Sequence, residues 1–110
     1  MARRIERGEI WTYEFRQPDK RRPVVVLSRA DAIEVLHTVL VAPITTTIHG
    51  VASEVVVGIA EGLRHDSAVN LDHVQVVEKS RLTKRLGQLG AQKMRAICRA
   101  LAIATGCTDG

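Results

Sequence analysis

Three cationic side chains stand directly before a run of β-branched residues in the first quarter of the sequence. Lys20, Arg21 and Arg22 precede Pro23 and the apolar segment 24–27. Valines have stiff χ1 angles and favour strands, and a continuous apolar run is typical of a strand buried on both faces. Proline belongs at the first residue of such a strand and pushes the preceding residue toward an extended conformation. The spacing predicts a guanidinium held at the start of a rigid strand, with a solvated charge cluster as the alternative.

A row of hydroxyl groups at the end of a second predicted strand is another candidate. Thr45, Thr46 and Thr47 close the segment 38–46, and His49 follows them. Consecutive threonines are compatible with strand propensity alone. They are equally compatible with a hydroxyl that donates a hydrogen bond to an anionic ligand at the strand end. The residue types leave both interpretations open.

The motifs of several other chemistries are absent from the sequence. There is no glycine-rich phosphate loop, no His-Glu-x-x-His and no Gly-x-Ser-x-Gly. The four histidines lack metal-ligand spacing, and the two cysteines are too few for a zinc site or a disulfide framework. We therefore expect a site that uses neither a metal nor a cofactor, with Cys98 as a small core residue and Cys107 in the tail.

Length and charge restrict the protein class further. A chain of 110 residues predicts one domain over 1–110. Sixteen lysines and arginines against twelve acidic residues give a net charge of +4, which suits a polyanion or an acidic protein segment as partner. No apolar run approaches the ~20 residues of a membrane span, and the N-terminal segment has no apolar signal-peptide core. We expect a cytoplasmic protein without a membrane anchor.

Short strands that carry these candidate residues fill most of the chain. Trp11, Tyr13 and Phe15 alternate, so they share one face of the first strand, either as core or as a base-stacking platform. Ser28 is expected to cap a short helical turn at 30–33. Pro43 indicates an edge strand or a bulge. The predicted strands are 10–16, 22–27, 38–46, 53–57, 67–71, 73–77 and 85–89, with one helical turn at 79–82.

One clear helix ends the chain, over 91–105. Gly90 and Gly106 supply its N-cap and C-terminal residues, and its apolar face is predicted to hold Met94, Ile97, Cys98, Leu101, Ala102 and Thr105. Many short strands and one terminal helix predict a mainly β (α+β) fold. We expect a small SH3-like β-barrel with a short helix after the second strand and the C-terminal helix packed on the sheet.

The order of these motifs resembles the MazF/PemK/Kid toxins of bacterial type II toxin–antitoxin pairs. The resemblance covers nearly the whole chain, and several motifs in the right order carry it. They are the opening strand 7–11, the Arg-Pro motif at 22–28, the strand 41–46 that ends in a threonine, and the blocks 66–67, 72–74 and 78–82.

The resemblance implies a homodimeric, sequence-specific endoribonuclease that cuts single-stranded RNA without a metal and inhibits translation and growth. The implied target is mRNA, with rRNA and tRNA as further candidates, and a disordered acidic tail of a cognate antitoxin would block the RNA groove. The implied catalytic pair is Arg22 and Thr45. RNA contacts are expected at Lys20, Arg21, Thr46, Thr47, His49, Asp72, His73 and Arg81.

Elementary chemistry agrees with this pair. Attack by the RNA 2′-hydroxyl passes through a phosphorane with extra negative charge, which a guanidinium can hold through two parallel hydrogen bonds. Arginine stays protonated near neutrality, so the general base is open. His73 stands where many relatives have glutamine, and it fits a base, an RNA contact or a plain substitution. The short, basic segment 16–21 replaces a longer loop with a Gly-x-Glu-Gln-x-Gly pattern that helps to shape the RNA site in relatives.

Two other functions compete with the nuclease. A gyrase-poisoning toxin of the CcdB type shares the fold, but it relies on a C-terminal Trp-Gly-Ile that this chain lacks. A non-catalytic barrel could instead bind nucleic acid through a basic cluster, and salt-dependent binding without cleavage would identify it. The cluster comprises Lys20, Arg21, Arg81, Lys84 and Arg85.

Overall fold

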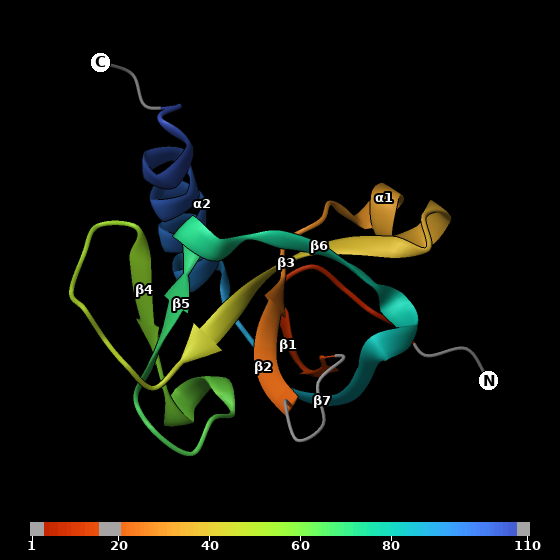
Figure 1. Cartoon of the computed structure of the whole chain (residues 1–110), viewed down its shortest axis with the longest axis horizontal. Coiled ribbons are helices and arrows are strands. Elements are labelled where there is room, and N and C mark those ends of the chain that lie inside the picture. The colour runs from red at the N-terminus through yellow and green to blue at the C-terminus, as the bar shows by residue number, and fades with distance from the viewer. Residues whose placement is uncertain (1–3, 16–20, 108–110) are drawn as a thin grey trace.

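One strongly curved antiparallel sheet contains all seven strands of the computed structural model, which describes residues 4–15 and 21–107 (Figure 1). The strands are β1 (Glu9–Glu14), β2 (Arg21–Val26), β3 (Thr38–Thr45), β4 (Glu54–Val57), β5 (Ser67–Asn70), β6 (Gln75–Glu78) and β7 (Leu82–Gln88). The helices are α1 (Ala30–Val35) and α2 (Ala91–Thr105), with single 3-10 turns η1 (Ile59–Glu61), η2 (Leu71–His73) and η3 (Lys79–Arg81). These elements confirm the mainly β fold with a terminal helix.

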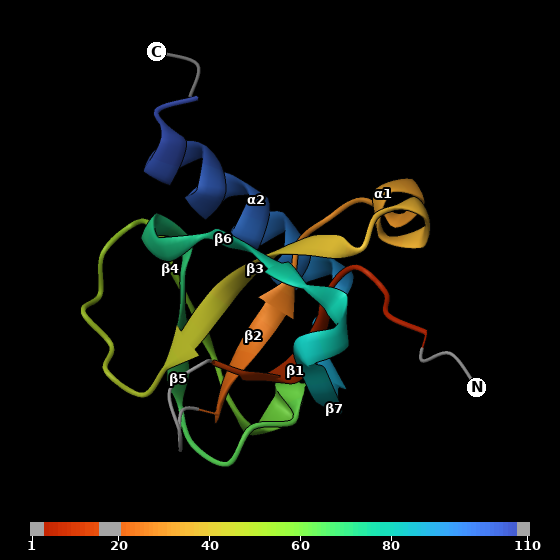
Figure 2. The same cartoon turned by 45° about the vertical axis from the view of Figure 1, so that its right-hand side comes forward.

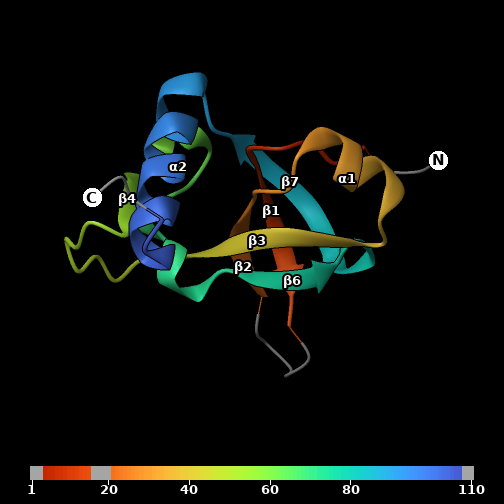
Figure 3. The same cartoon turned by 90° about the horizontal axis from the view of Figure 1, so that it is seen from above.

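Strand β3 organises the sheet because it pairs with three neighbours. The sheet order is β4-β5-β3-β2-β1-β7, and β6 pairs with the first half of β3 while β5 pairs with its end. Among the described strands no pairing joins β6 to β7, so the curved sheet stays open where η3 connects them. Helices α1 and α2 lie at opposite ends of the molecule (Figure 3).

The two faces of the sheet bury separate hydrophobic clusters. Val25 belongs to the cluster beneath α2, whereas Val24 and Val26 belong to the cluster on the other face with Trp11 and Tyr13. All three valines are 0% exposed, which confirms the prediction of a strand buried on both faces. Burying a valine fully contributes roughly 1.5–3 kcal/mol, so this strand forms the rigid centre of the fold.

The aromatic face of β1 is core, as one of the two interpretations predicted. Trp11 and Tyr13 are 5% and 7% exposed, and Phe15 packs against the same cluster while remaining partly accessible. The ring of Tyr13 meets that of Phe15 edge to face, with centroids 4.6 Å apart. Their edge nevertheless borders a cavity that is described below.

Several local predictions are wrong. Ser28 does not cap α1: Arg29 occupies that position, and the Ser28 hydroxyl accepts from the Leu40 backbone N–H at 2.8 Å instead. Pro43 was predicted on an edge strand or at a bulge, and the edge alternative is wrong because β3 is paired on both sides. Pro43 lies where the partner of β3 changes from β6 to β5, so the ladder on that side is already interrupted there. The last strand, expected over 85–89, begins earlier at Leu82, directly after η3.

The C-terminal helix has the predicted bounds and caps, and its predicted apolar face is confirmed in part. Gly106 takes the left-handed conformation that ends α2. Ile97 and Ala100 are the buried residues of this helix, and Met94, Ala96, Leu101 and Ala104 pack against the same cluster. Cys98, predicted as core, is exposed and lies 3.4 Å from a guanidinium nitrogen of Arg7. Thr105, which was predicted on the same face, is exposed as well.

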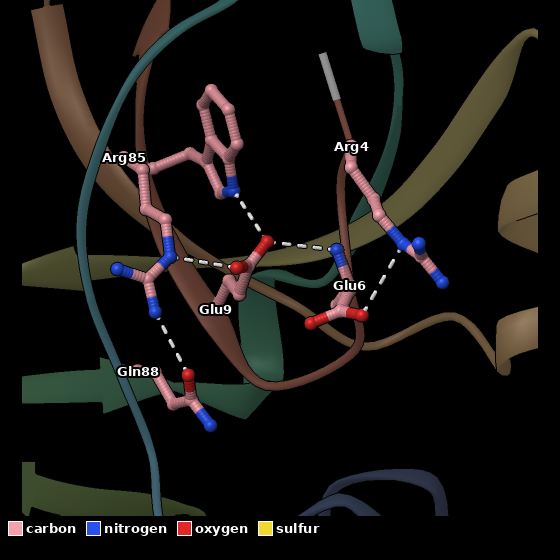
Figure 4. Close-up of polar contacts among 6 residues, drawn as sticks. Arg4, Glu6, Glu9, Arg85 and Gln88 are labelled. Carbon is pink, nitrogen blue, oxygen red and sulfur yellow. Dashed lines mark hydrogen bonds and ion pairs between the residues drawn. The ribbon is translucent and has the colours of Figure 1, made fainter.

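A buried carboxylate fastens the start of β1 to β7 (Figure 4). Glu9 is 5% exposed and accepts hydrogen bonds from the Glu6 backbone N–H at 2.7 Å, from Trp11 Nε1 at 3.1 Å and from Arg85 Nε at 2.6 Å. Arg85 also donates to Gln88 Oε1 at 2.8 Å. Burial by itself raises the pKa of Glu9, but these hydrogen bonds and the Arg85 charge outweigh it and leave the pKa below its ordinary value.

No helix in the described part of the chain is long and apolar enough to cross a membrane.

Candidate active site

A cavity of about 710 Å³ opens where the end of β1, the start of β2 and strand β6 come together. These bordering elements are seen in Figure 2. Its size is in the range of small-molecule and cofactor sites. Aromatic and aliphatic groups share its wall with cationic, anionic and amide groups. The lining residues are Tyr13, Phe15, Arg22, Thr38, Pro43, His73, Gln75, Val76, Val77, Glu78 and Arg81.

Arg22 lies in this cavity at the start of β2, as the sequence predicted. Its backbone pairs with that of Tyr13 across the β1–β2 ladder, which fixes the point from which the side chain projects. The side chain is exposed, and no hydrogen bond or ion pair joins it to the residues that the structure describes. An unpaired guanidinium on a rigid strand has five N–H donors available for an anionic ligand.

Arg81 reaches the same cavity but is already engaged. Its Nε donates to the Glu14 carbonyl at 2.8 Å, and its Cζ lies 5.7 Å from the centroid of the Tyr13 ring. The cation therefore rests on the aromatic edge of β1, where a cation–π contact contributes about 0.5–1 kcal/mol. This arrangement leaves the two terminal guanidinium nitrogens without a described partner beside the cavity.

Thr45 lies on β3 at the position that would face Arg22 if the β2–β3 pairing continued, although Thr45 is not part of the cavity lining. The β2–β3 pairing ends at Val24 opposite Pro43, and Arg22 and Thr45 each come two residues further along. Alternation along strands puts both side chains on one face of the sheet. The Thr45 hydroxyl oxygen accepts from the Thr47 backbone N–H at 3.1 Å, so its O–H remains available as a donor.

Turn η2 separates two adjacent predicted residues. His73 lines the cavity, and its Nδ1 lies 2.7 Å from the Asn70 side-chain nitrogen. Asp72 is not part of the lining: its carboxylate accepts from the buried Ser53 hydroxyl at 2.5 Å. The structure thus brings His73 to Arg22 and fastens Asp72 to the loop before β4.

The other predicted RNA-contact residues lie outside the cavity. Thr46, Thr47 and His49 form an exposed segment after β3, with the His49 backbone N–H bound to a Glu54 carboxylate oxygen at 3.0 Å. Arg21 is exposed and lies 3.9 Å from Glu14. Lys20 lies outside the described residues.

Sequence reasoning missed three polar residues of the cavity. One is Thr38 at the start of β3, and the other two are Gln75 and Glu78, both from β6. Neither β6 side chain has a hydrogen bond or ion pair within the described ranges 4–15 and 21–107. No local pattern marks them, because only the pairing of β6 with β3 brings them beside Arg22. The alternating aromatics could have indicated the wall formed by Tyr13 and Phe15. Within those same ranges no three His, Cys, Asp or Glu side chains lie close enough together to hold a metal ion.

A family model described as "PemK-like, MazF-like toxin of type II toxin-antitoxin system" matches residues 6–105. The chain belongs to this family. The match includes both strands that carry Arg22 and Thr45 as well as the turn that carries His73. The resemblance drawn from the sequence motifs is therefore confirmed.

Curated relatives in this family carry nuclease names. The chain is 52% identical over 103 residues to "Probable endoribonuclease MazF5" of Mycobacterium tuberculosis, covering 93% of this chain and 94% of the relative. It is 40% identical over 85 residues to "Endoribonuclease MazF3" of the same organism, covering 77% and 82%.

Solved MazF structures share the fold. The M. tuberculosis toxin MazF-mt6 superposes with a TM-score of 0.82 at 36% identity, covering 89% of this chain and 96% of that one. A mycobacterial endoribonuclease in complex with its cognate antitoxin gives a TM-score of 0.87 at 23% identity, covering 97% and 100%; at this identity it shows the fold alone.

Proposed function

We propose that the chain is a sequence-specific, metal-independent endoribonuclease toxin that cleaves single-stranded RNA through attack of the 2′-hydroxyl and thereby inhibits translation and growth. The single observation that carries the proposal is the position of Arg22, whose guanidinium lies on a rigid strand at a cavity with aromatic walls and has no hydrogen bond or ion pair with any described residue. Family membership and the nuclease names of the relatives support it. mRNA is the proposed target, and residues 1–110 act as one toxin domain.

Arg22 would hold the phosphodiester during cleavage. The phosphorane carries one more negative charge than the substrate, so a bidentate guanidinium binds it more tightly than the ground state. Thr45 would add a neutral hydroxyl donor from the adjacent strand end, on the same face as Arg22. The cavity wall strengthens the Arg22 interaction because it excludes water from one side of the phosphate.

The remaining predicted residues would bind the RNA on either side of that phosphate. His73 and Arg81 border the cavity, and Tyr13 with Phe15 offers an aromatic edge for a base. Thr46, Thr47 and His49 extend from the Thr45 end, whereas Lys20 and Arg21 precede Arg22. The hydrogen bond from Ser53 gives Asp72 a supporting role in shaping η2, with its second carboxylate oxygen left to meet RNA.

The proposed partners follow from the charge of the site. A disordered acidic tail of a cognate antitoxin would compete with RNA because carboxylates can occupy the same guanidinium donors. Two similar proteins have been solved with antitoxins, one mycobacterial and one from Deinococcus radiodurans. We propose a homodimer, for which light scattering should give twice the 12.1 kDa of one chain. The cytoplasm is the proposed location, since the RNA substrate is there.

RNA cleavage by the purified protein in excess EDTA tests this function. Wild type should cut single-stranded RNA and leave 2′,3′-cyclic phosphate and 5′-hydroxyl ends, and sequencing of the cut ends gives the recognised motif. Arg22→Ala should lose the activity. Arg29→Ala is the matched control because Arg29 is also exposed but pairs with Asp31 on α1, away from the cavity. Loss of cleavage with EDTA, or full activity of Arg22→Ala, would contradict the proposal, and binding without cutting would indicate a non-catalytic barrel.

A further inference from the structure

The amide of Asn70 has only one orientation that satisfies its neighbours. Asn70 precedes η2, and its side-chain oxygen accepts the Asp72 backbone N–H at 2.9 Å. A backbone N–H is always a donor, so the amide atom facing it must be the oxygen. The amide nitrogen therefore faces His73 Nδ1, at 2.7 Å.

This orientation fixes the proton on the His73 ring. An amide NH2 group only donates, so His73 Nδ1 must accept and cannot carry a hydrogen. This geometry is that of the tautomer with the ring hydrogen on Nε2. Since Nδ1 is occupied by Asn70, Nε2–H is the polar group that the ring presents at the cavity shared with Arg22.

We propose that Asn70 is a positioning residue that locks His73 as a hydrogen-bond donor toward the RNA. His73 then contacts an acceptor oxygen of the bound strand through Nε2–H and does not act as the base that removes the 2′-hydroxyl proton. The inference rests on the proposed nuclease function. It also makes the general base a different group, because a ring locked in this form offers the substrate no acceptor nitrogen.

Asn70→Asp is the sharpest variant for this proposal. A carboxylate keeps the acceptor for the Asp72 N–H and so keeps the start of η2 intact. Facing His73, however, it replaces a donor by an acceptor, so the ring hydrogen moves to Nδ1 or both nitrogens become protonated. The variant thus reverses the hydrogen-bond polarity toward His73 and adds one negative charge, for which the double-mutant cycle below controls.

Nitrogen-15 NMR of the histidine rings measures the tautomer directly in the free full-length protein. His73→Gln identifies the His73 signals by their disappearance. Wild type should show the Nε2–H form, and Asn70→Asp should show Nδ1–H or the doubly protonated ring. A wild-type His73 with its hydrogen on Nδ1 would overturn the proposal, and this result does not depend on whether the protein cuts RNA.

A double-mutant cycle on RNA cleavage tests the function of the contact. His73→Ala should lower kcat/KM about tenfold, the effect of one hydrogen bond, whereas His73→Gln keeps an amide donor and should stay within about threefold of wild type. Asn70→Asp should lower kcat/KM by about the same factor as His73→Ala. In the His73→Ala background Asn70→Asp should have no further effect on kcat/KM, because the ring that Asn70 positions is absent. Any loss seen in that background is caused by the added charge alone.

One outcome of this cycle separates failure of the inference from failure of the proposed nuclease function. Equal losses from Asn70→Asp in both backgrounds would assign Asn70 a purely structural role and overturn the inference while the nuclease function stands. A panel of RNAs with single base changes then locates the acceptor: loss of the His73 effect with one base indicates a base carbonyl, and a uniform effect indicates a phosphate oxygen.

Discussion

Two arginines on this sheet illustrate opposite uses of the same side chain. Arg85 donates to the buried carboxylate of Glu9 and to Gln88, and this network joins β7 to β1. Arg22 projects from the start of β2, where its backbone pairs with Tyr13 near the other end of β1. It has no carboxylate or carbonyl partner among the described residues. A satisfied guanidinium stabilises the fold, whereas an unsatisfied one on a buried strand is available to a ligand. The comparison predicts that stability and activity respond to different substitutions.

The largest effect should follow from Arg22. We expect Arg22→Lys to lower the single-turnover cleavage rate about 10²-fold, since an ammonium cannot reproduce two parallel hydrogen bonds to one phosphate. The melting temperature should stay within about 1 °C of wild type, because the side chain is exposed and makes no hydrogen bond or ion pair with the described residues. Calorimetry and a fluorogenic RNA assay measure both quantities, and a large loss of stability would contradict the assignment.

Thr45 should matter less than Arg22, but in the same direction. Thr45→Val keeps the shape and strand propensity and removes only the hydroxyl, so cleavage should fall about tenfold. Thr45→Ser restores a hydroxyl and should recover most of that loss. Thr83→Val is a control on β7, where the hydroxyl donates to the Thr12 carbonyl. Equal rates for Thr45→Val and wild type would remove this residue from the proposed pair.

Glu9→Gln should show the converse behaviour. The amide cannot accept hydrogen bonds from the Glu6 N–H, Trp11 and Arg85 together. The free energy of unfolding should therefore fall by about 2 kcal/mol, which lowers the melting temperature by roughly 8 °C. The cleavage rate of the folded protein should be unchanged. Glu14→Gln is the exposed control on the same strand. A melting temperature equal to wild type would show that the network contributes little.

The smallest effect is a pH dependence of stability. The folded-state pKa of Glu9 lies below its ordinary value, so its contribution is complete above the unfolded-state pKa and disappears as the pH falls through the folded-state pKa. Wild type should therefore lose its advantage over Glu9→Gln on acidification. Urea unfolding of both proteins from neutral to acidic pH measures this difference, and a constant difference over the whole series would contradict it.

Local patterns predicted those parts of the fold that depend on neighbouring residues. The valine run of β2 and the glycines at both ends of α2 gave correct elements, because strand propensity and helix termination are local properties. Met94, Ile97 and Leu101 of the predicted helix face do pack on the core, whereas Cys98 is exposed. Ala96, Ala100 and Ala104 pack on the same core, and alanines give little signal in a pattern of apolar residues.

The candidate site was predictable only in part, because sequence patterns report local properties and the site also depends on strand pairing. Arg22 could be located from the proline and valines that follow it. Gln75 and Glu78 could not, since they reach the cavity only through the pairing of β6 with β3. The separation of Asp72 from His73 depends on a hydrogen bond to Ser53, which lies nineteen residues earlier in the chain and leaves no local signal.

Chemical rescue of Arg22→Ala tests most directly whether the Arg22 guanidinium stabilises the reacting phosphate. Single-turnover cleavage is measured while guanidinium chloride is raised through concentrations that leave the protein folded, with sodium chloride at equal ionic strength as control. Guanidinium should restore part of the activity of Arg22→Ala and none of that of Thr45→Val. Cleavage by Arg22→Ala at the wild-type rate, without any added guanidinium, would contradict it.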